Sequence, residues 1–120
     1  GMGRSTDKQY ESISGNWSLY FSRLANNRHR RNDGLTKEVL QEVLERQCGC
    51  CALSGIPLTC KLKKGEHFAT NASVDRIEAG AKYSPENVRL VCSGINKWRG
   101  PQETSEFISF CMAVAEQHSF

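Results

Sequence analysis

The chain has 120 residues, enough for one compact domain and too few for two ordinary ones. Its 16 lysines and arginines exceed its 13 acidic residues, and the net charge of +3 is only a weak argument for an acidic partner. No apolar run approaches the ~18 residues of a membrane span, and no basic segment followed by an apolar stretch predicts a secretory signal. These features argue against a membrane protein and predict a cytoplasmic one.

The first 14 residues are polar and aperiodic, which predicts a flexible tail. Gly1 precedes Met2, and we interpret it as a remnant of cloning. Residues 15–120 are expected to form a single domain.

A basic helical region is predicted at residues 16–47. Its first helix has an apolar face with the spacing i, i+3, i+4 and i+7, formed by Trp17, Tyr20, Phe21 and Leu24. In the second helix, Thr36 is the predicted N-cap, and the apolar stripe consists of Val39, Leu40, Val43 and Leu44.

The remaining predicted elements are short. An irregular hairpin is expected at residues 51–58, followed by strands at 72–77 and 88–91. A short helix at 93–99 precedes a longer C-terminal helix at about 103–117. The expected fold class is α+β, with a small two-stranded sheet among helices.

Two polar side chains in this segment suit a metal ion. Asp75 ends the first predicted strand, where a carboxylate can hold a hard cation such as Mg²⁺ or Mn²⁺. Asn96 offers an amide oxygen from the short helix, and an ion with so few protein ligands keeps positions open for phosphate oxygens. Asn87, just before the second strand, is expected to fix the preceding loop by hydrogen bonds to its backbone. Taken singly, Asp75 and the following Arg76 are more typical of a surface ion pair, and Asn87 and Asn96 of turns.

The order of these residues resembles the HNH, or ββα-metal, endonuclease superfamily. Its pattern has an Asp-His pair ending the first strand, an Asn entering the second, and an Asn or His on the next helix. Here Asp75, Asn87 and Asn96 match that pattern, and the flanking segments Cys51-Ala-Leu-Ser-Gly-Ile-Pro-Leu and Tyr83-Ser-Pro-Glu-Asn are also similar to it.

The resemblance covers roughly residues 35–115. It is closest to small phage and prophage HNH-like proteins, in which Asp-Arg also stands where Asp-His is expected. It implies a ββα-metal core at about residues 70–100, a divalent metal cofactor, DNA as the partner, and the cytoplasm of a bacterial or phage-infected cell.

Arg76 stands where the resemblance implies a general-base His. An arginine cannot take up a proton, because its pKa exceeds ~12 and it has no acceptor lone pair. Losing a general base typically slows a reaction by ~10²–10⁴-fold. Three outcomes stay open: Arg76 binds phosphate or stabilises the transition state, His67 replaces the base, or the site is inactive and only a binding surface remains.

Many HNH proteins carry two Cys-x-x-Cys knuckles that bind structural zinc. Cys48 and Cys51 have the first spacing, and Cys92 opens the second, but position 95 is Ile95. A tetrahedral zinc site therefore lacks a ligand unless Cys60 or another residue supplies it. The alternative is that Cys51, Cys92 and Cys111 are small buried hydrophobic residues, and the lack of a secretory signal disfavours disulfides.

A run of basic residues without an acid begins at position 23 and consists of Arg23, Arg28, His29, Arg30 and Arg31. A solvated helix face is the usual interpretation of such a run. Because all its charges are positive and a nuclease-like site follows in the sequence, contact with phosphate is favoured here. Lys97, Arg99 and the lysines at 61–64 would widen this surface if they lie on the same side. Trp98 either stacks on a base or packs in the core, and the shortness of its helix favours the core.

Together these patterns predict a DNA-binding protein with a metal-dependent, HNH-like site that hydrolyses phosphodiester bonds. Arg76 keeps a second prediction open, a catalytically inactive DNA-binding module on the same fold. A third, a zinc-stabilised interaction domain, is disfavoured by the basic run. The sequence leaves the oligomeric state open.

Overall fold

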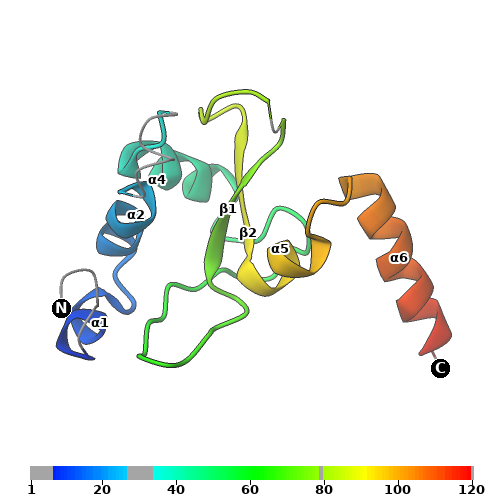
Figure 1. Cartoon of the computed structure of the whole chain (residues 1–120), viewed down its shortest axis with the longest axis horizontal. Helices are drawn as coiled ribbons and strands as arrows, with labels where there is room; N and C mark the ends of the chain where they lie inside the picture. Colours follow the sequence, from blue (N-terminus) through cyan, green and yellow to red (C-terminus); the bar gives the residue numbers. More distant parts are fainter. Residues whose placement is uncertain (1–6, 27–33, 79, 120) are drawn as a thin grey trace.

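The computed structural model describes residues 7–26, 34–78 and 80–119, and within them the chain forms five helices and one two-stranded antiparallel sheet (Figure 1). The α+β class predicted from the sequence is confirmed. The elements in chain order are α1 (Asp7–Ile13), α2 (Trp17–Ala25), α4 (Lys37–Arg46), β1 (Ala72–Arg76), β2 (Val88–Cys92), α5 (Ser93–Arg99) and α6 (Thr104–Gln117).

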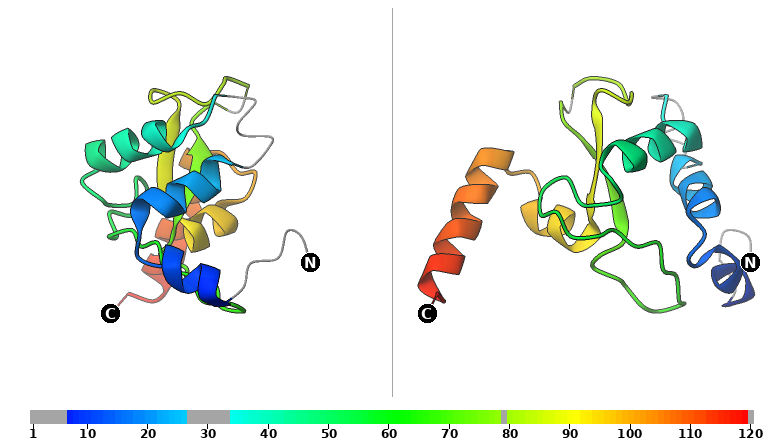
Figure 2. Two further views of the ribbon diagram at one scale, coloured as in Figure 1. Left: turned by 90° about the vertical axis from the view of Figure 1, so that its left-hand side faces the viewer. Right: turned by 180° about the vertical axis from the view of Figure 1, so that it is seen from behind.

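The sheet lies at the centre of the molecule. β1 and β2 pair with Ala72 opposite Cys92 and Asp75 opposite Arg89. Helices α2 and α4 lie on one side of the strands and α5 on the other (Figures 1 and 2). Because side chains alternate along a strand, residues of β1 that face the core and residues that face α5 come from successive positions.

The hydrophobic core lies between the sheet and the two helices α2 and α4. Its fully buried side chains include Phe21, Leu40, Val43, Val88 and Leu90. Burying a side chain of this size stabilises a fold by about 1.5–3 kcal/mol. The Tyr20 hydroxyl donates a 2.8 Å hydrogen bond to the Ala72 carbonyl and so ties α2 to β1.

Side chains cap both helices of this layer. Thr36 accepts a 3.2 Å hydrogen bond from the Val39 N–H, which confirms the predicted N-cap of α4. Asn16 accepts one of 3.0 Å from the Leu19 N–H at the start of α2. Each cap satisfies a helix donor that would otherwise lack a partner, and removing such a cap typically costs ~1 kcal/mol.

The N-terminal segment is the main departure from the predicted fold. The first 14 residues were expected to be an irregular tail, and this is wrong for Asp7–Ile13, which form α1. The Arg23 guanidinium stacks on the Tyr10 ring, 5.0 Å from its centroid, and holds α1 against α2. No residue of α1 is buried, so the sequence has no apolar stripe there to reveal the helix.

The molecule is elongated because α6 projects from the body (Figure 2). Its extents are 48 × 32 × 27 Å, and its radius of gyration is 15.4 Å. A compact chain of this length is expected to have about 13–14 Å. Among the described residues, no helix is long and apolar enough to cross a membrane.

Candidate functional site

A groove of about 670 Å³ runs beside the end of β1 and the turn that joins α5 to α6. It is lined by Val74, Asp75, Arg76, Ile77, Tyr83, Arg89, Arg99, Gly100, Pro101, Gln102, Glu103 and Thr104. Three guanidinium groups in this lining outnumber two carboxylates. The groove is therefore a candidate site for an anion such as phosphate.

Asp75 is held in the groove by two arginines from different elements. Its Oδ2 accepts a 2.6 Å hydrogen bond from Arg89 Nε across the sheet, and its Oδ1 accepts one of 2.5 Å from Arg99 Nη2 at the end of α5. Asp75 is only 7% exposed, so water and salt screen these ion pairs less than they would screen a surface pair. The alternative that Asp75 belongs to a surface ion pair is therefore wrong.

The same two arginines tie the groove to the start of α6. Arg89 Nη2 donates to Thr104 Oγ1 at 2.8 Å, and Arg99 Nη1 donates to the Gln102 carbonyl at 3.1 Å. Two buried atoms here, Arg99 Nε and Gln102 Oε1, have no hydrogen-bond partner within the described part of the chain. Such atoms are rare in folded proteins, and both belong to residues that line the groove.

Asn96 reaches the site because α5 packs closely on the chain before β1. The Gly94 N–H donates a 2.9 Å hydrogen bond to the Ala69 carbonyl, and a Cβ at position 94 would lie 2.9 Å from the Ala69 Cβ. Only glycine permits this approach without a shift. Asn96 Nδ2 then donates to Ser73 Oγ at 2.9 Å, and Asn96 Oδ1 accepts from Arg99 Nη2 at 3.3 Å.

The oxygens of Asp75 and Asn96 therefore converge on one nitrogen atom, Nη2 of Arg99. They are separated by at most the sum of the two hydrogen-bond lengths, about 5.8 Å. A carboxylate and an amide oxygen suit a hard divalent cation that keeps water and phosphate as its other ligands. The donor types and their convergence fit such an ion, but it would have to displace the Arg99 guanidinium.

Arg76 lines the same groove as Asp75. Its guanidinium carbon lies 4.8 Å from the centroid of the Tyr83 ring, and its Nη1 donates a 3.3 Å hydrogen bond to the Ala81 carbonyl. These contacts hold the Arg76 side chain against the loop that joins β1 to β2. Its charge is thereby fixed at the groove wall, where it can contact a bound anion.

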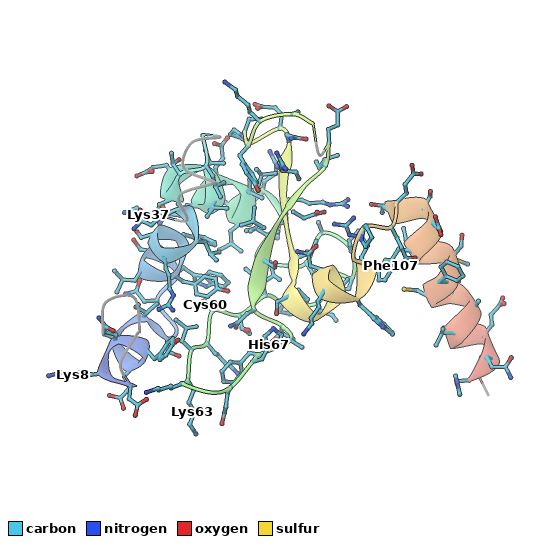
Figure 3. The ribbon with its side chains drawn as sticks, in the orientation of Figure 1. Lys8, Lys37, Cys60, Lys63, His67 and Phe107 are labelled. Carbon is cyan, nitrogen blue, oxygen red and sulfur yellow. The ribbon has the colours of Figure 1, made fainter. Side chains whose placement is uncertain are left out.

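His67, the residue considered as a substitute base, is not brought to Asp75. It is exposed, and its Nε2 lies 3.5 Å from Ser93 Oγ (Figure 3). The Ser93 N–H bonds to the carbonyl of Asn71, immediately before β1, whereas Asp75 lies near the far end of that strand. The geometry gives no support to a role for His67 in proton abstraction at Asp75.

Asn87 fixes the loop between the strands, as expected from its place before β2. Its Oδ1 accepts a 2.7 Å hydrogen bond from the Glu78 N–H. Its Nδ2 lies 3.1, 3.3 and 3.0 Å from the carbonyl oxygens of Glu78, Ala81 and Lys82. A buried side chain with this many partners defines the loop that carries Tyr83 to the groove.

The cysteines do not assemble the predicted zinc ligand set. Cys51 and Cys92 are adjacent, because the Cys92 N–H bonds to Cys51 Sγ at 3.3 Å. Cys48 is exposed, and buried Cys60 precedes the basic loop, where its carbonyl accepts the Gly15 N–H at 3.0 Å. Among the described residues, no group of three or more His, Cys, Asp or Glu side chains is placed to hold a metal ion.

The pKa values of the neighbouring Cys51 and Cys92 thiols are shifted in opposite directions. Burial opposes the Cys51 thiolate, but hydrogen bonds from the Ser54 side chain and the Cys92 backbone outweigh it, so the pKa of Cys51 lies below the ordinary 9.0. Burial and the adjacent Cys51 raise the pKa of Cys92. Both side chains are in the core, as the alternative to zinc binding predicts, but that alternative is wrong for Cys111, which is only partly buried.

The basic residues fall on two sides of the molecule. Arg23 stacks on Tyr10, and Lys63 and Lys64 line a hollow beside the same tyrosine, so these three charges share the α1 side. Lys97 is exposed on α5, beyond the sheet. Arg99 points inward to Asp75. The predicted contacts Arg28, His29, Arg30 and Arg31 lie outside the described residues.

Arg89, which binds Asp75 directly, was not among the predicted site residues. The signal is its place in β2, where it is the one charged residue of a strand that is otherwise apolar. Recognising its role required the register that sets it opposite Asp75. The expectation that Trp98 packs in the core is wrong, because this side chain is 69% exposed.

Comparisons with protein-family models, curated proteins and solved structures found no match to this chain.

Proposed function

We propose that this protein binds DNA and slowly hydrolyses phosphodiester bonds with a divalent metal ion at an HNH-like site. The observation that carries the proposal is the convergence of Asp75 Oδ1 and Asn96 Oδ1, from strand and helix, on one cationic atom. The order β1, β2, α5 and the loop-fixing Asn87 support a ββα-metal core.

The arginines of the groove supply the anion-binding part of the site. Arg76, Arg89 and Arg99 all line it, and guanidinium groups bind phosphate oxygens through paired N–H donors. Arg89 and Arg99 together carry one positive charge more than Asp75 neutralises. A backbone phosphate would therefore find a surplus of donors and charge here.

In the proposed reaction, Asp75 and Asn96 would hold Mg²⁺ or Mn²⁺ once Arg99 has released them. Such an ion stabilises negative charge on phosphate and lowers the pKa of its bound water. Arg99, freed from Asp75, would pair with the phosphate, and Arg76, which lines the same groove, would contact the same group. The described lining of the groove contains no histidine to serve as the general base, so we expect slow cleavage.

A second function is favoured by a separate observation. Both Asp75 oxygens are already bonded to guanidinium groups, and the Asp75 side chain is buried. If these ion pairs persist when DNA and metal are present, the groove binds phosphate without cutting it. The protein is then a DNA-binding module on the same fold.

A nicking assay on supercoiled plasmid DNA separates the two functions. The wild-type protein is incubated with Mg²⁺, Mn²⁺ or chelator, and Asn96→Ala removes one metal donor. The control Asn26→Ala makes the same chemical change at an exposed position at the end of α2. We expect metal-dependent nicking that falls roughly 10–100-fold in Asn96→Ala and is unchanged in Asn26→Ala.

Two results would count against cleavage at this site. Wild-type protein that binds the plasmid but never nicks it with either metal would leave the binding module as the function. Equal nicking by Asn96→Ala and wild type would assign the activity to another site or to a contaminant.

A further inference from the structure

Helix α6 carries the largest group of exposed apolar side chains in the described structure. Five large hydrophobic residues on α6 and the adjoining end of α5 are between 45% and 69% exposed: Trp98, Ile108, Phe110, Met112 and Val114. The helix is attached to the body at its first turns, where the Phe107 ring meets Trp98 edge-on at 6.3 Å. Beyond that contact it projects from the body (Figures 1 and 3).

The apolar surface has a hollow on each side of α6. Phe110 and Val114 line one of about 420 Å³ together with Trp98. On its other side a groove of about 340 Å³ separates α6 from the body, with Leu53, Ile95 and Met112 among its walls. One molecule thus presents an apolar helix and an apolar cleft that can receive side chains of a helix, the two halves of a self-complementary contact.

The charges of this surface indicate which kind of molecule can bind to it. The charged residues of α6 are Glu106 and Glu116, and the helix has no lysine or arginine. An acidic helix is repelled by DNA phosphates and by anionic lipid headgroups. A protein surface with an apolar cleft and an adjacent cation suits it better, and this chain itself offers such a surface, because Lys97 is exposed on α5 next to Trp98.

We propose that two copies of this chain form a symmetric dimer through α6, each placing the apolar side of its helix in the groove between α6 and the body of the other. Lys97 of each copy then lies near the acidic residues of the partner helix. This dimer requires neither DNA nor metal, so it can be tested independently of the proposed nuclease function.

The area available suits such a dimer. The five exposed side chains present on the order of 500–600 Å² to solvent, given the 150–250 Å² that an aromatic side chain can bury. The groove walls add further apolar area. The total area then approaches the roughly 800 Å² per partner of a standard interface. A symmetric contact uses the patch twice, so both copies lose their exposed apolar surface.

Sedimentation equilibrium of the full chain over a wide concentration range tests the proposal. We expect wild-type protein to have twice the 13.4 kDa mass of one chain. Phe110→Glu and Val114→Glu each place a charge in the contact and should raise the dissociation constant of the dimer by about tenfold or more. Lys97→Glu should weaken the dimer as well, through repulsion by the partner's acids.

Leu19→Glu is the matched control, because Leu19 is 44% exposed on α2, on the other side of the sheet, and should leave the dimer intact. Circular dichroism checks that every variant keeps its helices, and Val114→Glu near the end of α6 provides a test if Phe110→Glu does not fold. A monomeric wild-type protein at all concentrations would overturn the proposal. Dimers that persist in both α6 variants would overturn it too, since the copies would then meet through another surface.

Discussion

Nη2 of Arg99 lies 2.5 Å from Asp75 Oδ1 and 3.3 Å from Asn96 Oδ1, so a guanidinium group occupies the point where a strand oxygen and a helix oxygen converge. If the proposed metal site exists, Arg99 and the divalent cation would compete for the same acceptors. This relationship also gives the proposed site a resting state in which the carboxylate is neutralised by the protein itself.

Removing the competitor should therefore strengthen metal binding. In Arg99→Gln, Asp75 loses one of its two guanidinium partners, and a hydrogen bond to a charged group typically contributes about 1.5–3 kcal/mol. We expect the dissociation constant for Mn²⁺, measured by isothermal titration calorimetry without DNA, to fall by roughly 10–100-fold.

Lys97→Gln is the control for that experiment. It removes the same charge from the same helix, but no contact links Lys97 to Asp75 in the described structure. Its effect on Mn²⁺ affinity should be small. An equal gain in both variants would indicate general electrostatics, and no gain in Arg99→Gln would count against competition at Asp75.

Asp75 should also matter for stability. Asp75→Ala leaves Arg89 and Arg99 without their common partner, and breaking a buried ion pair from one side typically costs about 3–5 kcal/mol. Urea denaturation should show this loss in the free energy of unfolding. Glu66→Gln, which removes one member of the exposed 3.5 Å pair with Lys63, should change that energy by less than about 0.5 kcal/mol.

Arg76 is expected to contact phosphate rather than to act as a base. Replacing it with alanine should weaken binding to duplex DNA and lower the slope of log affinity against log salt concentration by about 0.9. Fluorescence anisotropy at several salt concentrations measures both quantities. Lys82→Ala removes an exposed charge from the same loop, outside the groove lining, and should leave the slope unchanged.

The Cys51–Cys92 contact is expected to be structural. Cys51→Ala removes the acceptor of the Cys92 N–H and empties a buried position, which should cost about 1–3 kcal/mol of unfolding free energy. Cys48→Ala, at an exposed position, should cost less than about 0.5 kcal/mol. If chelators lower the melting temperature and Cys48→Ala is as damaging as Cys51→Ala, a zinc knuckle is present after all.

Most of the fold could be predicted from the sequence because its elements have strong local signals. The apolar spacing of α2 and α4, the Thr36 cap and the two short strands were each visible as a pattern. α1 was missed, since a polar helix without a buried residue has no periodicity to detect. The exposure of Trp98 was missed because it depends on where α6 lies, which is a matter of tertiary structure.

Part of the geometry of the candidate site agrees with the sequence. The loop contacts of Asn87 agree with its expected role, and Asp75 and Asn96 both bond to Arg99, while a metal-binding role for these two residues stays a prediction. The sequence could not indicate that Arg89 and Arg99 meet on Asp75, because that contact joins three elements whose register and packing lie beyond local patterns. The same limit applies to His67, which is near Asp75 in sequence and remote from it in the fold.

We propose that Asp75 and Asn96 form a metal site from which Arg99 can be displaced. A crystal of the protein soaked in Mn²⁺ tests it most directly, through the anomalous difference map. We predict a peak between Asp75 Oδ1 and Asn96 Oδ1, at the ~2.1 Å from each that a small divalent ion requires, with the Arg99 guanidinium moved away. A map without a peak there, in which Arg99 still bonds to both oxygens at saturating Mn²⁺, would contradict the account.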